Sequence, residues 1–105
     1  MPVMTFELGS YSIQALTGED QPVYVHLWEM PDRYRGYISF HPHFTGNFTW
    51  HDRIGIVNAF MPPSKLDVML DMLRNEKPVY LTVSVEHNVA SLRTGKEPPG
   101  EEEGS

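Results

Sequence analysis

The chain has no cysteine among its 105 residues. Disulfide bonds, thiolate metal sites and cysteine nucleophiles are therefore excluded. Long apolar runs are also missing, since no stretch approaches the roughly 20 residues that span a bilayer. The opening MPVMTFELGS lacks the basic start and the apolar core of a secretory signal. We expect a cytoplasmic protein that does not attach to a membrane.

Positive charge is scarce. Eight Lys and Arg residues stand against fourteen Asp and Glu residues, for a net charge of −6. The last ten residues, KEPPGEEEGS, hold four Glu and one Lys, and residues 1–95 are still acidic without them. This balance argues against duplex DNA as a partner, because phosphate binding draws on clustered Lys and Arg.

Complete catalytic and cofactor motifs are also missing. There is no P-loop and no glycine-rich phosphate cradle. Ser39, His51 and Asp52 supply the residue types of a nucleophilic triad, but without the spacing of a nucleophile elbow. We therefore expect no cofactor and favour binding over catalysis.

The composition that remains is that of one folded domain. Hydrophobic residues make up 40% and charged residues 21% of the chain, as in ordinary globular proteins. The length suits a single hydrophobic core. We predict one β-rich domain over residues 1–95. The last ten residues, 96–105, contain a Pro pair and no apolar residue to bury, which predicts a disordered acidic tail.

The stretch PPSKLDVMLDMLRNEKP predicts an amphipathic helix over residues 65–75. Its apolar residues recur at the helical spacing i, i+3, i+4 and i+7. Ser64 is expected to cap the first turn, and Pro78 to stop the chain from continuing as helix. The face predicted to pack on the core consists of Leu66, Met69, Leu70 and Leu73.

Strands are predicted on both sides of this helix. Gly9 and Ser10 interrupt the first of them, which predicts a bulge. The element order β-β-β-β-α-β-β, read as antiparallel throughout, indicates an α+β fold: a curved sheet of five or six strands, or a small barrel, with the helix before the last hairpin. This order resembles that of the oligonucleotide/oligosaccharide-binding barrel. The predicted strands are residues 5–16, 22–30, 34–41, 53–61, 79–86 and 89–94.

The second and third strands allow a prediction of register. With Pro31 and Asp32 as the loop, Val25 faces Ile38 and Leu27 faces Gly36, which places the apolar partners on the core side. Trp28 is then expected opposite Arg35. The other face of this hairpin is predicted to carry Tyr24, His26, Trp28, Arg35, Tyr37 and His41.

A face rich in Tyr, Trp, Arg and His and poor in Lys is typical of the centre of a protein interface. We expect it to bind a protein partner or a second copy of the chain. Trp28, Tyr37 and Tyr24 are the expected anchors, with Arg35 and His41 as polar contacts.

Single-stranded nucleic acid is the alternative ligand for this face. Aromatic platforms interleaved with positive charge are how such strands are bound. The stretch RGYISF begins like the strand signature of RNA recognition motifs, with Arg-Gly followed by an aromatic residue, and departs from it at Ile38 and Ser39.

The histidines offer a second alternative, a metal or small-molecule site. The pair His41 and His43 resembles the His-x-His pair of cupin-like barrels, in which a glycine comes before the pair and a glutamate ligand follows. Gly36 precedes the pair here, but there is no glutamate between residues 29 and 76. Together with His51 the pair offers three imidazoles, a ligand type that borderline metals use, so His41, His43 and His51 are the candidate metal ligands.

Overall fold

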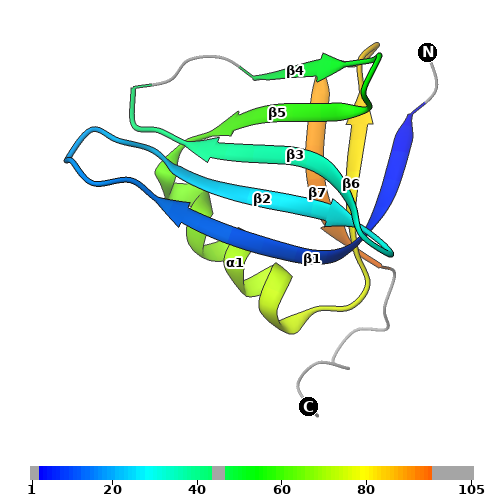
Figure 1. The fold of residues 1–105 in the computed structure, drawn as a ribbon, viewed down its shortest axis with the longest axis horizontal. Helices are drawn as coiled ribbons and strands as arrows, with labels where there is room; N and C mark the ends of the chain where they lie inside the picture. Colours follow the sequence, from blue (N-terminus) through cyan, green and yellow to red (C-terminus); the bar gives the residue numbers. More distant parts are fainter. Residues whose placement is uncertain (1–2, 44–46, 96–105) are drawn as a thin grey trace.

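A computed structural model of the protein describes residues 3–43 and 47–95. Within them the chain forms one curled, seven-stranded sheet in the order β4-β5-β3-β2-β1-β6-β7, with a helix against its inner side (Figure 1). The fold is α+β and mostly antiparallel, as predicted. The strands are β1 Met4–Ala15, β2 Val23–Glu29, β3 Arg33–Phe40, β4 Phe48–His51, β5 Ile56–Met61, β6 Val79–Ser84 and β7 Val89–Thr94; the helical segments are the 3-10 turn Pro63–Lys65 and α1 Leu66–Asn75.

Strand β1 joins the two parts of the sheet. Its residues 4–7 pair with β6 and its residues 8–15 pair with β2, and the register shifts between Leu8 and Ser10. The predicted bulge at Gly9 is therefore confirmed. A side chain there would meet Met30, because a Cβ on Gly9 would lie 2.8 Å from Met30 Cγ. The bend in β1 lets β6 and β7 run across the direction of the other strands (Figure 1).

The prediction of a wholly antiparallel sheet is wrong at one place. Strand β5 pairs in parallel with β3, while β4 lies antiparallel to β5 at the edge of the sheet. The chain leaves β3, returns as β4, and then inserts β5 between the two. Strand β4 was not predicted, because its four residues are too few to show a pattern.

The segment 53–61, predicted to be a strand throughout, is shorter in the structure. Strand β5 begins only at Ile56, and Val57 and Ala59 are buried on the inner face. Asn58 and Phe60 alternate with them and are half-buried on the outer face. Strand β5 therefore contributes to both the core and the outer surface of the sheet.

The helix confirms its predicted apolar face. Met69 is buried in the core, and Leu66, Leu70 and Leu73 pack against it. The predicted cap at Ser64 is wrong, because Ser64 lies inside the 3-10 turn and no side chain caps either helical segment. The buried core that the sheet and helix share is Val25, Leu27, Ile38, Phe40, Val57, Ala59, Met69, Leu81 and Val83.

The C-terminal hairpin is close to its prediction. Ala90 and Leu92 pack on the core from β7. Strand β6 ends at Ser84, so Val85 is exposed in the turn 85–88 instead of facing inward. The predicted acidic tail, residues 96–105, lies outside the described residues.

No helix in the described part of the chain is long and apolar enough to cross a membrane. The longest, α1, has ten residues and presents charged side chains such as Asp67 and Arg74.

Candidate functional site: an aromatic sheet face

The hairpin β2–β3 follows the predicted register over most of its length. Val25 pairs with Ile38 and Leu27 pairs with Gly36. Near the turn the pairing differs, because the loop has three residues, 30–32, and Glu29 faces Arg33. A bulge compensates for the odd loop by placing one extra residue, Arg35, in β3.

This bulge exchanges the positions of two neighbouring side chains. In an unbroken strand Arg35 would share a face with Tyr37, and Tyr34 would point to the core. In the structure Trp28 pairs with Tyr34, not with Arg35. Tyr34 therefore joins the outer face and Arg35 is buried on the inner one.

The outer face of the hairpin carries a cluster of rings, called here the aromatic face. It lies on the side of the sheet that faces away from α1. In Figure 1 the helix lies behind β1 and β2. All five side chains are half-buried, because each ring covers part of its neighbours. The aromatic face consists of Tyr24, His26 and Trp28 from β2 and Tyr34 and Tyr37 from β3.

His26 is the centre of the aromatic face. Its ring centroid lies between 5.8 and 6.3 Å from the centroids of the other four rings. The outer rings also contact one another, with Tyr24 and Tyr37 edge to face at 5.1 Å and Trp28 and Tyr34 tilted at 5.3 Å. Such pairs contribute about 0.5 to 1.5 kcal/mol each beyond the area they bury.

Hydrogen bonds fix the orientation of the His26 ring. Nε2 lies 2.9 Å from the side-chain amide oxygen Oε1 of Gln14, which accepts a hydrogen bond from the ring. Nδ1 lies 2.8 Å from the Tyr34 hydroxyl, with which it forms a second hydrogen bond. The ring is thus held from both sides, by β1 and by β3.

The position of Tyr34 in this face changes its acidity. Burial, and secondarily the neighbouring Tyr37 hydroxyl, raise the pKa of Tyr34 above its ordinary value of 10.0. Burial acts in this direction because it disfavours the charged phenolate.

We expect Tyr34 to ionise at a higher pH in the folded protein than in the unfolded chain, which an alkaline absorbance titration measures. The unfolded chain then loses this proton at lower pH than the folded one, so the free energy of unfolding contributed by Tyr34 falls as pH rises above 10. Tyr34→Phe should remove both this ionisation and its share of the fall in stability. A titration curve of Tyr34→Phe that keeps the same ionisation would contradict this expectation.

Arg35 has a structural role instead of the predicted surface role. Its Nε and Nη2 reach Glu29 Oε1 at 2.8 and 2.7 Å, and its Nη1 donates to the Gly55 carbonyl at 2.8 Å. The guanidinium also lies 4.0 Å from the centre of the Phe6 ring. These contacts tie β3 to the end of β2, to the turn before β5 and to β1.

The predicted polar contact His41 lies just beyond the end of β3, at the first residue after Phe40. Its Nδ1 accepts from the His43 backbone amide at 3.1 Å. His43 faces Asp20 at 3.6 Å, while His51 lies 3.1 Å from the Asn58 amide. No group of three metal-ligating side chains is found in residues 3–43 and 47–95. The rings of His41 and His43 do lie together, with centroids 5.8 Å apart, but His51 does not join them in a group of three.

No family model, no curated protein and no solved structure matches this chain. Its function therefore has to be argued from its own side chains.

Proposed function

We propose that this chain is a binding module whose aromatic face docks a protein partner. The observation that carries the proposal is the cluster of five rings in mutual contact on a sheet face turned away from the helix. Tyr and Trp are enriched where interfaces concentrate their binding energy, because they offer a large area and lose little rotamer entropy.

The chemistry of the face supports a protein over a nucleic acid. Phosphate recognition draws on Lys or Arg beside the stacking rings. The five rings include no such cation, and Arg35 is occupied by Glu29 on the opposite side of the sheet. The polar atoms on offer are hydroxyls, the indole N–H and an imidazole, which suit the hydrogen bonds of a protein surface.

The mutual support of the rings also prepares the face for binding. His26 is fixed by Gln14 and Tyr34, and Trp28 is fixed by Tyr34. Side chains that are ordered before binding lose less entropy on association. A partner with an apolar centre would therefore meet a surface that needs little rearrangement.

Trp28→Ala and Tyr37→Ala are expected to weaken partner binding by about 30-fold each, which is about 2 kcal/mol. Their melting temperature should change only modestly, because each loses ring contacts at a half-exposed site. Binding is measured by affinity capture with the full chain as bait, followed by titration of the purified partner. Tyr80→Ala is the matched control, since Tyr80 lies on the other half of the sheet beside Arg93.

A partner lost with both face variants and kept with Tyr80→Ala supports the proposal. A partner lost equally with all three variants, or with none, contradicts it. Light scattering over a range of protein concentrations first shows whether the partner is a second copy. Fluorescence anisotropy with labelled single-stranded DNA and RNA tests the competing ligand: salt-sensitive binding that Trp28→Ala abolishes would overturn the protein assignment.

A further inference from the structure

Strand β1 has a free edge that the sheet does not use. On one side, residues 8–15 pair with β2. On the other side, β6 pairs only with residues 4–7. Alternate backbone groups of residues 10–15 therefore point away from β2 without a strand partner among the described residues. Within the described residues, no turn or loop forms a backbone hydrogen bond with residues 10–15 either.

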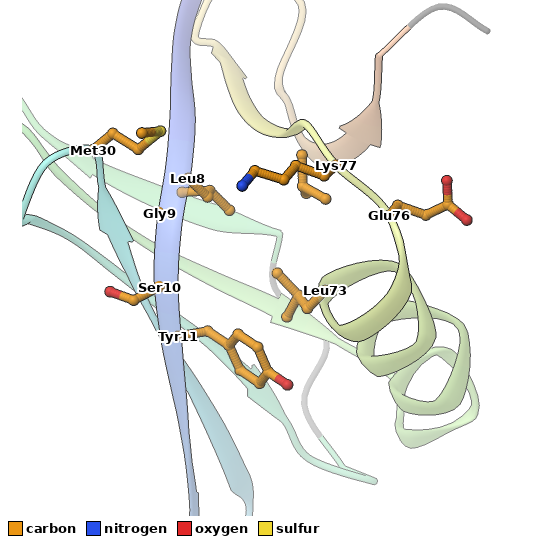
Figure 2. Close-up of a pocket in the computed structure, with 9 residues that line it drawn as sticks. Leu8, Gly9, Ser10, Tyr11, Met30, Leu73, Glu76 and Lys77 are labelled. Atoms are coloured by element: carbon orange, nitrogen blue, oxygen red, sulfur yellow. The ribbon is translucent and has the colours of Figure 1, made fainter. Parts of the chain in front are cut away.

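A cleft lies beside the start of this edge. It has a volume of about 360 Å³ and is bounded by β1 and by the C-terminal end of α1. Figure 2 shows the side chains of Tyr11 and Leu73 directed towards one another from the two elements. The other large apolar side chains in the lining are Leu8, Met30 and Val79.

Apolar surface continues along the edge past the cleft. Ile13 is 43% exposed and Leu16 is 39% exposed, although both belong to the apolar pattern of β1 and the loop after it. Ile13 pairs with the fully buried Val25 and so belongs to the inner face of the sheet. A strand added at this edge would place alternate side chains over Ile13 and Tyr11.

An antiparallel strand at this edge would continue the pairing that β6 begins. Strand β6 is antiparallel to β1 and occupies the same edge from residue 7 towards residue 4. A second antiparallel strand, paired with residues 10–15, would run in line with β6 and towards its start. Its C-terminal end would then lie beside Lys77 and Pro78, the residues that lead into β6.

The charge at that end fits a carboxylate. Figure 2 shows the Lys77 side chain extending towards β1, whereas the Glu76 side chain points away from the cleft. Lys77 has no ion pair within the described residues. Among the described residues the cleft thus presents one cation without an ion pair, where the end of an antiparallel strand would stop.

From these features we infer that the β1 edge binds the C-terminal segment of a partner protein as an added antiparallel strand. The free backbone groups of residues 10–15 pair with the segment, and its alternate apolar side chains cover Tyr11, Ile13 and Leu73. Its terminal carboxylate pairs with Lys77. Strand addition of this kind obtains affinity from main-chain hydrogen bonds and specificity from the side-chain pockets. This site is separate from the aromatic face and does not depend on its function.

The test uses nuclear magnetic resonance of the full-length, isotope-labelled chain. The probe is a peptide of about eight residues that alternates threonine and valine and ends in a free valine carboxylate, added up to about 1 mM so that weak binding is detected. We expect shifted amide signals at residues 9–15 and at Leu73 and Lys77, with slower hydrogen exchange at alternate residues of 10–15. The same peptide as a carboxamide should bind about fivefold more weakly.

Two exposed lysines provide a matched pair of variants. Lys77→Glu should weaken binding of the carboxylate peptide by about tenfold and leave the carboxamide nearly unaffected. Lys65→Glu makes the same charge change at the other end of the helix and should have little effect. Because both side chains are exposed, neither variant is expected to disturb the fold.

Four outcomes would overturn the inference. They are no shifted signals at 1 mM peptide, shifts confined to the aromatic face, equal binding of the carboxylate and the carboxamide, or equal loss in the two lysine variants. The other occupant to be tested is the segment 96–105 of the same chain, because the Gly95 amide before it donates to the Pro78 carbonyl beside the cleft. A chain that ends at Gly95 lacks this segment. Peptide binding that appears only in this shorter chain would assign the cleft to residues 96–105 of the protein itself.

Discussion

Gly36→Ala is expected to lower the free energy of unfolding by about 4 kcal/mol or more, the range reserved for severe backbone or packing conflicts. A domain of this size has a total stability of about 5 to 15 kcal/mol. The variant should therefore be largely unfolded or insoluble, or melt about 20 °C below the parent chain. The measurement is chemical denaturation followed by circular dichroism.

The conflict at Gly36 has two parts. Its φ of +122° is a conformation that residues with a side chain rarely adopt, and it costs such residues about 1 to 3 kcal/mol. A Cβ would also lie 1.8 Å from the carbonyl oxygen of Val57, its partner in the parallel pairing of β3 with β5. Because that obstacle is a backbone atom, β3 and β5 would have to separate. The separation would disturb the core, since Val57 is fully buried.

Gly18→Ala is the control that separates these two parts. Gly18 also has a positive φ, +110°, but a Cβ there meets only the flexible Gln21 side chain at 3.1 Å. We expect it to cost about 1 to 3 kcal/mol from the backbone conformation alone. If Gly36→Ala costs no more than Gly18→Ala, the close approach of β5 does not constrain position 36.

Arg35→Met is expected to lower the free energy of unfolding by about 3 kcal/mol, because it leaves Glu29 without its partner in a partly buried site. The Glu29 side chain is 26% exposed, so water relieves part of the penalty. The Gly55 carbonyl also loses its donor, and Phe6 loses the cation above its ring. Denaturant titration of the purified variant measures the change.

Three further variants distinguish the ion pair from simple loss of charge. Arg33→Met removes an exposed neighbouring charge and should change stability by no more than about 0.5 kcal/mol. Arg35→Lys should not restore stability, because one ammonium group lacks the fork that reaches both Glu29 and Gly55. Arg35→Met combined with Glu29→Met should be more stable than Arg35→Met alone, because no unpaired charge remains. A double variant as unstable as the single one would contradict this account.

Much of the fold could be predicted because its patterns are local. The alternation of Val79, Leu81 and Val83 predicted β6, and the helical spacing of Leu66 and Met69 predicted α1. Both patterns arise from side chains a few residues apart, which the backbone geometry places on one face. The inward pairs of β2 with β3 were predicted on the same basis, since a shift by one residue would have exposed every apolar side chain.

The arrangement of β3, β4 and β5 could not be predicted in this way. Whether β5 pairs in parallel with β3 depends on backbone hydrogen bonds between two segments that are not adjacent in the sequence. The four residues of β4 carry no recognisable period. Position Gly36 did hold a signal, because a glycine inside an apolar strand often marks a bulge or a close backbone contact. Read as a bulge, it would have predicted that Tyr34 and Arg35 exchange faces.

The sequence by itself determined which side chains alternate, where the helix lies, and that an aromatic outer surface accompanies β2, since Tyr24, His26 and Trp28 follow from period two alone. Only the tertiary structure decided that Tyr34 completes this surface while Arg35 ties the core together. The reason is that an odd loop and a compensating bulge set the register between two strands, not within one. The free edge of β1 likewise exists only because β6 pairs with no more than residues 4–7 of that strand, a consequence of how segments distant in the sequence meet.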